Sequence, residues 1–419
     1  MASELDGSGL TYQVLDGDAA SAAYILAREF RSGARAVAKS RFRVLHDDGR
    51  RLIVRAVSGN EMDELSERGF QCRYLPTTPL DFAPSSTRGL TGVHRKVAVA
   101  SNAAVAAMMA QVTQTNLEEN LRGLTGLQPV LAGGTTTNIR TRHQNSGVPL
   151  QRATALAYER FAALGLQTSY QGWTNGGKVN RNVVGVRLGS TAPSQIVVVC
   201  AHIDDMPATG DAPGADDNAS GSVAVLAAAE IMASRSFERT VRFVIFTGEE
   251  QGLLGSEICA QAAQAAGDDI VAVLNLDMLG WDGDNDNRLK LYVRPTSDPG
   301  HAGDRDIAAT FTNVVRIYGL RSGLAPEIAA EVSDWSDHYS FQNRSFPAIC
   351  AIEEDVDDFN PYYHTANDTL ARLNLPYYAR FVKAVVGTAA HLAKPRSFVA
   401  ALAVAPASRA HSAAAAGGQ

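Results

Sequence analysis

Three neighbouring stretches of the sequence decide the fold: QIVVVCAH (residues 195–202), GSVAVLAAAEIMAS (221–234) and TVRFVIFTG (240–248). The first and third are short, apolar and rich in β-branched residues, which predicts buried strands. The stretch between them is an alanine-rich apolar run of helical length. A buried strand, a helix and a second buried strand indicate a parallel sheet that helices cover on both faces.

The same alternation continues on both sides of this unit. Further strand candidates are NVVGVRLG (182–189), DIVAVLNLDM (269–278), RLKLYVR (288–294) and FPAICAIEE (346–354), and LLGSEICAQAAQAA (253–266) is a further helix candidate. We therefore predict that residues 116–395 form an α/β domain with a mainly parallel central sheet. In such sheets, ligands bind beyond the carboxyl ends of the strands.

The rest of the chain divides into three regions. Residues 1–75 alternate strand-like runs with two helical patterns, AASAAYILAREF (19–30) and NEMDELSERG (60–69), which predicts a small α+β region. Residues 76–115 are rich in Pro, Thr and Ala and are interpreted as a linker with one helix. Residues 396–419 are interpreted as a low-complexity tail.

Composition excludes several classes of function. The 419 residues carry a formal net charge of -6 and no block of Lys and Arg, which argues against a nucleic acid partner. No apolar run approaches the roughly 20 residues that cross a bilayer, so no membrane partner is expected. The first residues lack the basic start and apolar core of a secretory signal. As written, the sequence predicts a cytoplasmic protein, or a secreted one if a signal had been removed.

Charged and histidine residues gather where the predicted strands end. His202, Asp204 and Asp205 follow the first strand, Glu249 and Glu250 follow the third, and Asp277 and His364 follow two others. Buried carboxylates without partners are costly, and several at one edge repel one another. A divalent cation resolves both problems, and histidines with carboxylates suit zinc or a similar ion.

The helix at 221–234 is preceded by GADDNASG (214–221), which holds two adjacent carboxylates, Asp216 and Asp217. Asp and Asn side chains at a helix start are usually caps for free backbone N–H groups. Capping accounts for one such residue but not for Asp-Asp-Asn between small residues. A second role for one of the two aspartates is therefore expected.

Six fragments in this order carry a resemblance: AHIDD (201–205), PGADDNASG (213–221), FTGEEQGLLGS (246–256), NLDMLG (275–280), SDHYSF (336–341) and YYHTANDT (362–369). Together they resemble the two-zinc aminopeptidase family, which includes bacterial leucyl-type aminopeptidases and, more distantly, glutamate carboxypeptidase. The resemblance spans residues 116–395. It implies a zinc exopeptidase-like fold and peptide substrates with a free N-terminus.

The resemblance also assigns roles to single residues. Asp217 would bridge two zinc ions, His202 and Asp277 would complete one site, and Glu250 and His364 would complete the other. Asp204 would orient His202. Glu249 would be the general base for a water that the two metals activate.

Several alternatives share features of this pattern. A related two-zinc carboxypeptidase or dipeptidase would differ in its substrate pocket, whereas a glutaminyl cyclase-like acyltransferase would need one zinc ion. A non-catalytic domain on the same fold would be expected to have lost ligands. The region 1–75 resembles the propeptides of some relatives, which inhibit or assist folding, and the alternative is a purely structural lobe.

Overall fold

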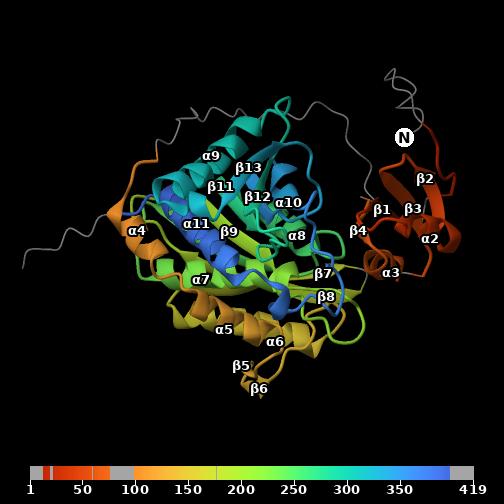
Figure 1. Cartoon of the computed structure of the whole chain (residues 1–419), viewed down its shortest axis with the longest axis horizontal. Helices are drawn as coiled ribbons and strands as arrows, with labels where there is room; N and C mark the ends of the chain where they lie inside the picture. Colours follow the sequence, from red (N-terminus) through yellow and green to blue (C-terminus); the bar gives the residue numbers. More distant parts are fainter. Residues whose placement is uncertain (1–12, 19–21, 59, 76–98, 176, 397–419) are drawn as a thin grey trace, which may run out of the picture.

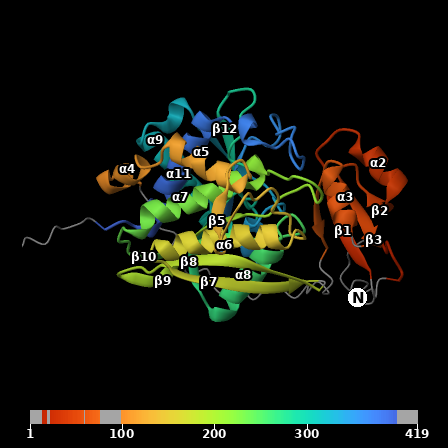
Figure 2. The ribbon, with the colours of Figure 1, turned by 90° about the horizontal axis from the view of Figure 1, so that it is seen from below.

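The computed structural model describes residues 13–18, 22–58, 60–75, 99–175 and 177–396. These residues form a small N-terminal unit and a larger body that lies beside it (Figures 1 and 2). Most of the proposed linker and nearly all of the proposed tail lie outside the described residues. Among the described helices, none combines the length and apolar character needed to span a membrane.

The N-terminal unit is a four-stranded antiparallel sheet, in the order β2-β3-β1-β4, with two helices. Its elements are β1 (Ala23–Glu29), α2 (Ala34–Arg41), β2 (Arg43–Asp47), β3 (Arg51–Ala56), α3 (Glu61–Glu67) and β4 (Phe70–Tyr74). The sheet and helices enclose a core of their own, with Leu52, Val54, Leu65 and Phe70 fully buried.

The helix expected at residues 19–30 is a strand in the structure. Residues 23–29 form β1, which pairs with β3 on one side and β4 on the other and buries Ile25 and Ala27. Alanine has the highest intrinsic helix propensity, but such propensities are small in energy, and pairing along both edges of β1 outweighs them. A short helix, α2, follows instead at residues 34–41.

The body is built on an eight-stranded sheet among the described residues, in the order β13-β12-β14-β11-β9-β10-β8-β7. The strands are β7 (Gln167–Asn175), β8 (Lys178–Arg187), β9 (Ala192–His202), β10 (Arg239–Phe246), β11 (Asp269–Leu276), β12 (Arg288–Val293), β13 (Ala325–Ala330) and β14 (Ala348–Glu353). The central strands β14, β11, β9 and β10 are parallel, which confirms the predicted fold class.

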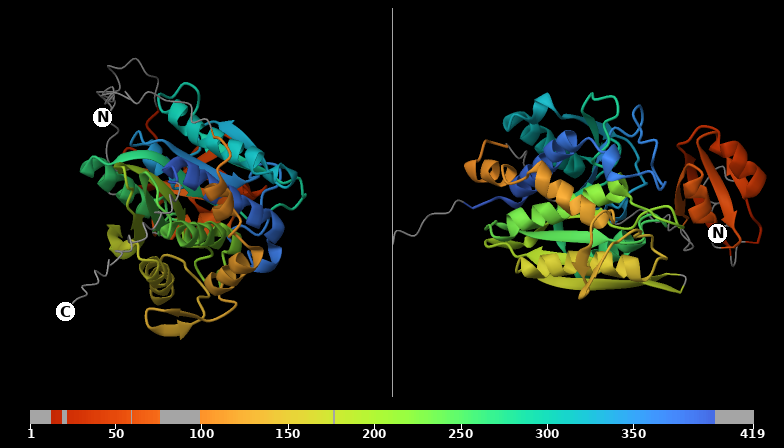
Figure 3. Two further views of the ribbon diagram at one scale, coloured as in Figure 1. Left: turned by 90° about the vertical axis from the view of Figure 1, so that its left-hand side faces the viewer. Right: turned by 60° about the horizontal axis from the view of Figure 1, so that its bottom comes forward.

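Helices cover both faces of this sheet. They are α4 (Ala103–Met109), α5 (Gln114–Leu124), α6 (Val148–Ala163), α7 (Gly221–Ala233), α8 (Leu254–Ala266), α9 (His301–Ile317), α10 (His338–Gln342) and α11 (Leu375–Ala393). Helices α6, α7, α9 and α11 pack on one face, and α8 and α10 pack on the other. The two further views show the N-terminal unit at one end of this layered body (Figure 3).

The sequence of β9 shows why both faces are buried. Val197 and Val199 point into the core under α7 and α11, whereas Val198 and Cys200 point into the core under α8 and α10. Side chains alternate between the faces of a strand, so a strand covered on both sides must be apolar throughout.

Two edge strands, β7 and β13, were not predicted from the sequence. Strand β7 (QTSYQGWTN) is polar along much of its length, and β13 (APEIAA) contains a proline and a glutamate in only six residues. Edge strands are partly exposed and need no continuous apolar run. A short hairpin of β5 (Val130–Ala132) and β6 (Thr135–Thr137) completes the body.

Helix α4 lies within the stretch interpreted as a linker. Its residues Val105, Met108 and Met109 are buried in the core of the body, and the helix packs against α11. Asn102 caps the helix, because its side-chain oxygen accepts hydrogen bonds from the N–H groups of Ala104 and Val105. The packed body therefore extends at least from α4.

Candidate metal centre

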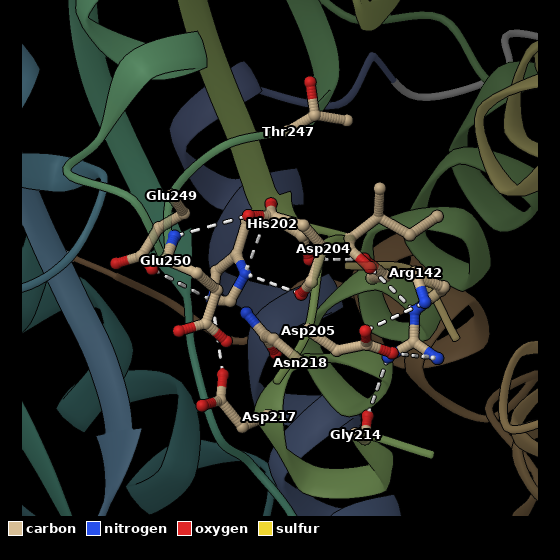
Figure 4. A network of polar contacts seen from close by, with 12 residues as sticks. Arg142, His202, Asp204, Asp205, Gly214, Asp217, Asn218, Thr247, Glu249 and Glu250 are labelled. Carbon is tan, nitrogen blue, oxygen red and sulfur yellow. Dashed lines mark hydrogen bonds and ion pairs between the residues drawn. The ribbon is translucent and has the colours of Figure 1, made fainter. Parts of the chain in front are cut away.

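Three neighbouring parallel strands end at the same edge of the sheet and carry charged groups there. His202 is the last residue of β9, Glu249 and Glu250 lie in the turn after β10, and Asp277 directly follows β11. Strand β9 lies between β10 and β11 in the sheet. The fold therefore brings these four side chains to one place. Figure 4 shows three of them, His202, Glu249 and Glu250.

Asp217 lies between the two predicted histidine ligands. It belongs to the segment Ala215–Ser220, which leads into α7 with a non-helical backbone at Asp217. Its Oδ1 lies 3.4 Å from His202 Nε2, and its Oδ2 lies 3.1 Å from His364 Nε2. One carboxylate thus faces a histidine with each of its oxygens.

The other predicted ligands complete a group on each side of Asp217. His202 Nε2 lies 3.2 Å from Asp277 Oδ1, and His364 Nε2 lies 2.8 Å from Glu250 Oε2. The side chains are nearly buried, with none of the five residues more than 6 % exposed. The structure brings all five predicted ligands together.

Glu249 lies beside the first of these groups. Its Oε2 is 4.0 Å from His202 Nε2, and the potential ligand atoms of His202, Glu249 and Asp277 lie within 4.8 Å of one another. Burial raises the pKa of Glu249 well above its usual value, and the carboxylate of Asp277 raises it further. A buried carboxylate of this kind holds a proton more readily than an exposed one.

The centre holds more negative charge than its histidines balance. Burial lowers the pKa of His364, but Glu250 and Asp217 outweigh that effect and raise the pKa to about 10. Burial raises the pKa of Glu250 to about 7, and the neighbouring Asp217 adds to this shift. Four buried carboxylates and two histidines form a donor set that fits divalent cations such as zinc.

Asp204 contacts His202 mainly through its main chain. His202 Nδ1 lies 3.2 Å from the Asp204 carbonyl oxygen and 3.8 Å from the carboxylate Oδ1. The Asp204 Oδ2 instead accepts a hydrogen bond from the Glu250 N–H at 3.3 Å. Asp204 therefore connects the loop after β9 with the turn after β10.

The two neighbours of Asp217 have different tasks. Asn218 Oδ1 accepts a hydrogen bond from the Gly221 N–H at the start of α7, and its Nδ2 donates to the Leu276 carbonyl. Asp216 points elsewhere, because its oxygens accept bonds from the Gly280 N–H and the Asn360 side chain. Asn218 therefore caps α7, and Asp216 connects the loop after β11 with the loop that contains Asn360.

Several residues that hold the candidate ligands in place were not predicted from the sequence. The Ser336 hydroxyl donates to Asp277 Oδ2, and Asn275 Nδ2 donates to Ser336 Oγ at 2.7 Å. Asp368 Oδ2 accepts the N–H groups of Asp216 and Asp217 at 3.1 and 3.0 Å. Asp368, Ser336 and Asn275 all lie inside the quoted fragments, which were the available signal.

His338, Tyr339 and Tyr363 lie near the centre in the sequence fragments but are not among the five candidate ligands. His338 is fully buried, and burial lowers its pKa to about 4, which keeps the ring neutral. Tyr363 stacks on the His364 ring with centroids 3.6 Å apart. Arg73 lies over the ring of Tyr339.

The N-terminal unit covers the mouth of the centre. The cavity beside His202 and Glu249 measures about 30 Å³ and is also lined by Arg28 and Gln71 of that unit. A space of this size holds about two water molecules. Phe30 packs edge-on against Tyr363 with ring centroids 4.7 Å apart.

A few polar contacts hold the unit in this place. Arg73 Nη2 lies 2.8 Å from Asp334 Oδ2, and the Ala208 N–H donates to Glu67 Oε1 at 3.2 Å. His143 Nε2 of the body lies 3.4 Å from Asp63 Oδ1 of α3. These contacts join the unit to three different loops of the body.

Comparison with known sequences identifies relatives for most of the body. The model of peptidase family M28 matches residues 182–389. Leucine aminopeptidase 1 of Arthroderma otae is 30 % identical over 306 residues, which cover 70 % of this chain and 77 % of that protein.

Solved structures share the fold. The LapA aminopeptidase of Legionella pneumophila superposes with a TM-score of 0.65 at 20 % identity, covering 90 % of this chain and 99 % of that one. A glutaminyl cyclase of Fimbriiglobus ruber has a TM-score of 0.55 at 18 % identity, with 68 % and 96 % covered. Because two activities occur on this one fold, the fold alone does not distinguish between them.

Proposed function

Because the chain belongs to peptidase family M28 and is a metallo-aminopeptidase, we propose that it removes N-terminal residues from peptides at a two-zinc centre. The placement of the Asp217 carboxylate between His202 and His364 supports this proposal most strongly. In this proposal Asp217 is shared, His202 and Asp277 hold one zinc ion, and Glu250 and His364 hold the other. When bound, the ions would supply Lewis acidity toward the scissile carbonyl and make a water molecule more acidic.

The chain's own residues would move the proton. Glu249 accepts a proton from the attacking water and later delivers it to the leaving amine. The raised pKa of Glu249 suits this task, because the residue must hold the proton between the two steps. Ser336 and Asn275 keep Asp277 in place through their hydrogen bonds.

Similarity to leucine aminopeptidases favours the N-terminus of a peptide as the substrate end. A free α-amine is positive, and the carboxylates of Glu249 and its neighbours offer it an attractive surrounding. A related two-zinc carboxypeptidase would share these groups and differ in its substrate pocket. The sequence similarity therefore carries the choice of aminopeptidase action.

For the N-terminal unit we propose an inhibitory role as a propeptide-like cover. Phe30, Arg28 and Gln71 occupy the approach to the centre and leave room for about two water molecules. A peptide therefore needs the unit to be displaced or removed before it reaches Glu249. The unit's separate core makes such a movement possible without disrupting the body.

The exchange of Glu249 for Gln tests the proposed reaction. Glu249→Gln keeps size and hydrogen bonding but removes the base, so we expect two zinc ions per chain and a turnover lowered by about 10²–10⁴-fold. The matched variant is Glu250→Gln, which should lower zinc occupancy first. Zinc content and kcat on an aminoacyl nitroanilide, measured for both full-length variants, decide between the roles.

Two results would contradict the assignment. Loss of zinc in Glu249→Gln with two zinc ions retained in Glu250→Gln would exchange the two roles. A wild-type chain that binds a single zinc ion would favour the glutaminyl cyclase-like alternative, which needs one.

A further inference from the structure

We infer that Arg142 is a positioning residue that fixes the distance between two metal ligands, His202 and Asp217. Arg142 lies in the loop between β6 and α6, and its side chain is fully buried behind the centre (Figure 4). The inference rests on the proposed two-zinc function, because it concerns how that centre is held together.

The guanidinium group of Arg142 connects the two segments that carry these ligands. Its Nε donates to the Ile203 carbonyl at 2.7 Å, directly after His202. Its Nη1 donates to the Pro213 carbonyl and its Nη2 to the Gly214 carbonyl, both at 2.9 Å. Gly214 precedes Asp217 by three residues, so one planar group joins the two ends of the loop that runs from β9 to the segment Ala215–Ser220.

Arg142 also connects this loop to helix α5. Its Nη1 donates to the Leu124 carbonyl at the end of α5, at 2.6 Å. Four carbonyl oxygens from three separate segments therefore meet one side chain. The rigid fork of a guanidinium holds several acceptors in fixed directions, which the single ammonium group of lysine does not do.

The charge of Arg142 has a dedicated partner. Asp205 is also fully buried, and its Oδ2 lies 3.2 Å from Arg142 Nη1. Its Oδ1 accepts the Arg142 N–H at 2.8 Å. A buried guanidinium without a partner would be very costly, so Asp205 allows the group to occupy this position.

The packing around Gly214 shows how closely the groups fit. Gly214 has a φ of 45°, and a Cβ atom there would lie 2.7 Å from Arg142 Nη2 and 2.4 Å from the Asp217 carbonyl oxygen. Neither contact is tolerated without movement. These short distances show that the Arg142 guanidinium lies directly against the backbone that leads to Asp217.

A second buried arginine provides a matched control. Arg294 forms two bonds of 2.8 Å with Asp304 and further bonds with the carbonyls of Gly300, Gln342 and Phe346. It resembles Arg142 in burial, charge pairing and carbonyl contacts. It differs in lying between β12 and α9, where it touches none of the ligand-bearing loops.

The test is zinc affinity of the full chain, measured by competition with a chelator, together with thermal unfolding of the metal-free chain. Arg142→Lys should raise the Kd of at least one zinc ion by about 10–100-fold, the range known for residues that support metal ligands. Arg294→Lys should lower the unfolding temperature but leave both zinc Kd values unchanged. A residue that only stabilises the fold would change the unfolding temperature alone.

Unchanged zinc Kd values in folded Arg142→Lys would overturn the inference. If that variant does not fold, Asp205→Asn decides, because it removes the charge that pairs with Arg142 and leaves the packing around Gly214 and Asp217 unchanged. It should weaken zinc binding as well, and wild-type affinity would contradict the inference. The wild-type chain separates the two proposals: binding of fewer than two zinc ions contradicts the proposed function, whereas two tightly bound ions in all variants contradict only the role of Arg142.

Discussion

The body and the N-terminal unit both contribute residues to the covered cavity, but they do so in different ways. The body supplies all five candidate ligands and Glu249, each placed at a strand end or in a loop that buried groups hold. The N-terminal unit, which has a separate core, supplies Arg28 and Gln71 to the cavity lining and packs Phe30 against Tyr363.

We propose from this difference that the body carries out the chemistry and that the N-terminal unit controls access. Hydrogen bonds of Asp204 and Asp216 connect the loops that carry the ligands, which restricts their movement. The N-terminal unit contacts the body through polar pairs, through arginines over Trp335 and Tyr339, and through Phe30, which packs on Phe359 and Tyr363. Each part has a core of its own. We therefore expect changes in the body to remove activity and changes in the unit to release it.

The largest expected effect is removal of metal. Chelation should abolish activity, and zinc should restore it, because Glu249 has no activated water to deprotonate without the ions. The N-terminal unit should keep its fold, since its core contains no candidate ligand among its described residues. Activity assays and circular dichroism after dialysis check both expectations, and full activity without metal would contradict the two-zinc proposal.

The second prediction compares two ligands within the body: Asp217, which we propose both zinc ions share, and Asp277, which we propose binds one. Asp217→Ala should lose both zinc ions, whereas Asp277→Ala should lose mainly one, because only Asp217 faces both histidines. Zinc content of the purified variants measures this difference. Near-normal occupancy of both sites in Asp217→Ala would contradict the shared role of Asp217.

The third prediction concerns the cover. Cleavage at a protease site introduced between residues 76 and 98 should raise activity by about 10–1000-fold, the range expected if the open form is a minor population. Phe30→Ala should raise activity without cleavage, because it removes the ring that packs on Tyr363. The matched control is Val37→Ala on the exposed side of α2. Equal activity of cleaved and uncleaved chains would exclude an inhibitory role.

The smallest expected effect is a pH dependence of docking. Burial lowers the pKa of His143, but its bond with Asp63 and the nearby Asp205 outweigh this and raise the pKa above its usual value. A raised pKa means that the contact stabilises docking below a pH of about 6.5 and loses this contribution as pH rises through the higher value in the docked state.

Dissociation of the cleaved unit measures this dependence without relying on catalysis. The unit should bind the body more tightly at pH 6 than at pH 9, by a few-fold, and Asp63→Asn should make binding nearly independent of pH in this range. Stronger binding at pH 9 in the wild-type chain would show that another group controls docking.

The sequence predicts the body well because its central strands are buried on both faces. Val197 to Val199 must be apolar wherever they point, so the run itself indicates the layer architecture. Residues 23–29 show the opposite case, since their alanine-rich pattern is compatible with a helix and only pairing with β3 and β4 makes them a strand. Strand pairing between distant segments has no local signal.

The candidate site was predictable to the same extent: its strand ends have a local signal in the sequence, and its contacts between distant segments have none. His202 and Asp277 stand at the ends of recognisable strands, so the sequence predicts that they lie close together. Arg142 lies 60 residues before His202 in a polar loop, and nothing around it indicates four buried carbonyl contacts. The contact of Phe30 with Tyr363 joins residues that are much further apart in the sequence. Supporting and covering residues therefore emerge only from the folded structure.

Anomalous diffraction at the zinc edge, from crystals of the full chain supplied with zinc, tests the central claim most directly. The account predicts two peaks, one beside His202 and Asp277 and the other beside Glu250 and His364, with Asp217 between them. A single peak, or two peaks that do not share Asp217, would contradict it.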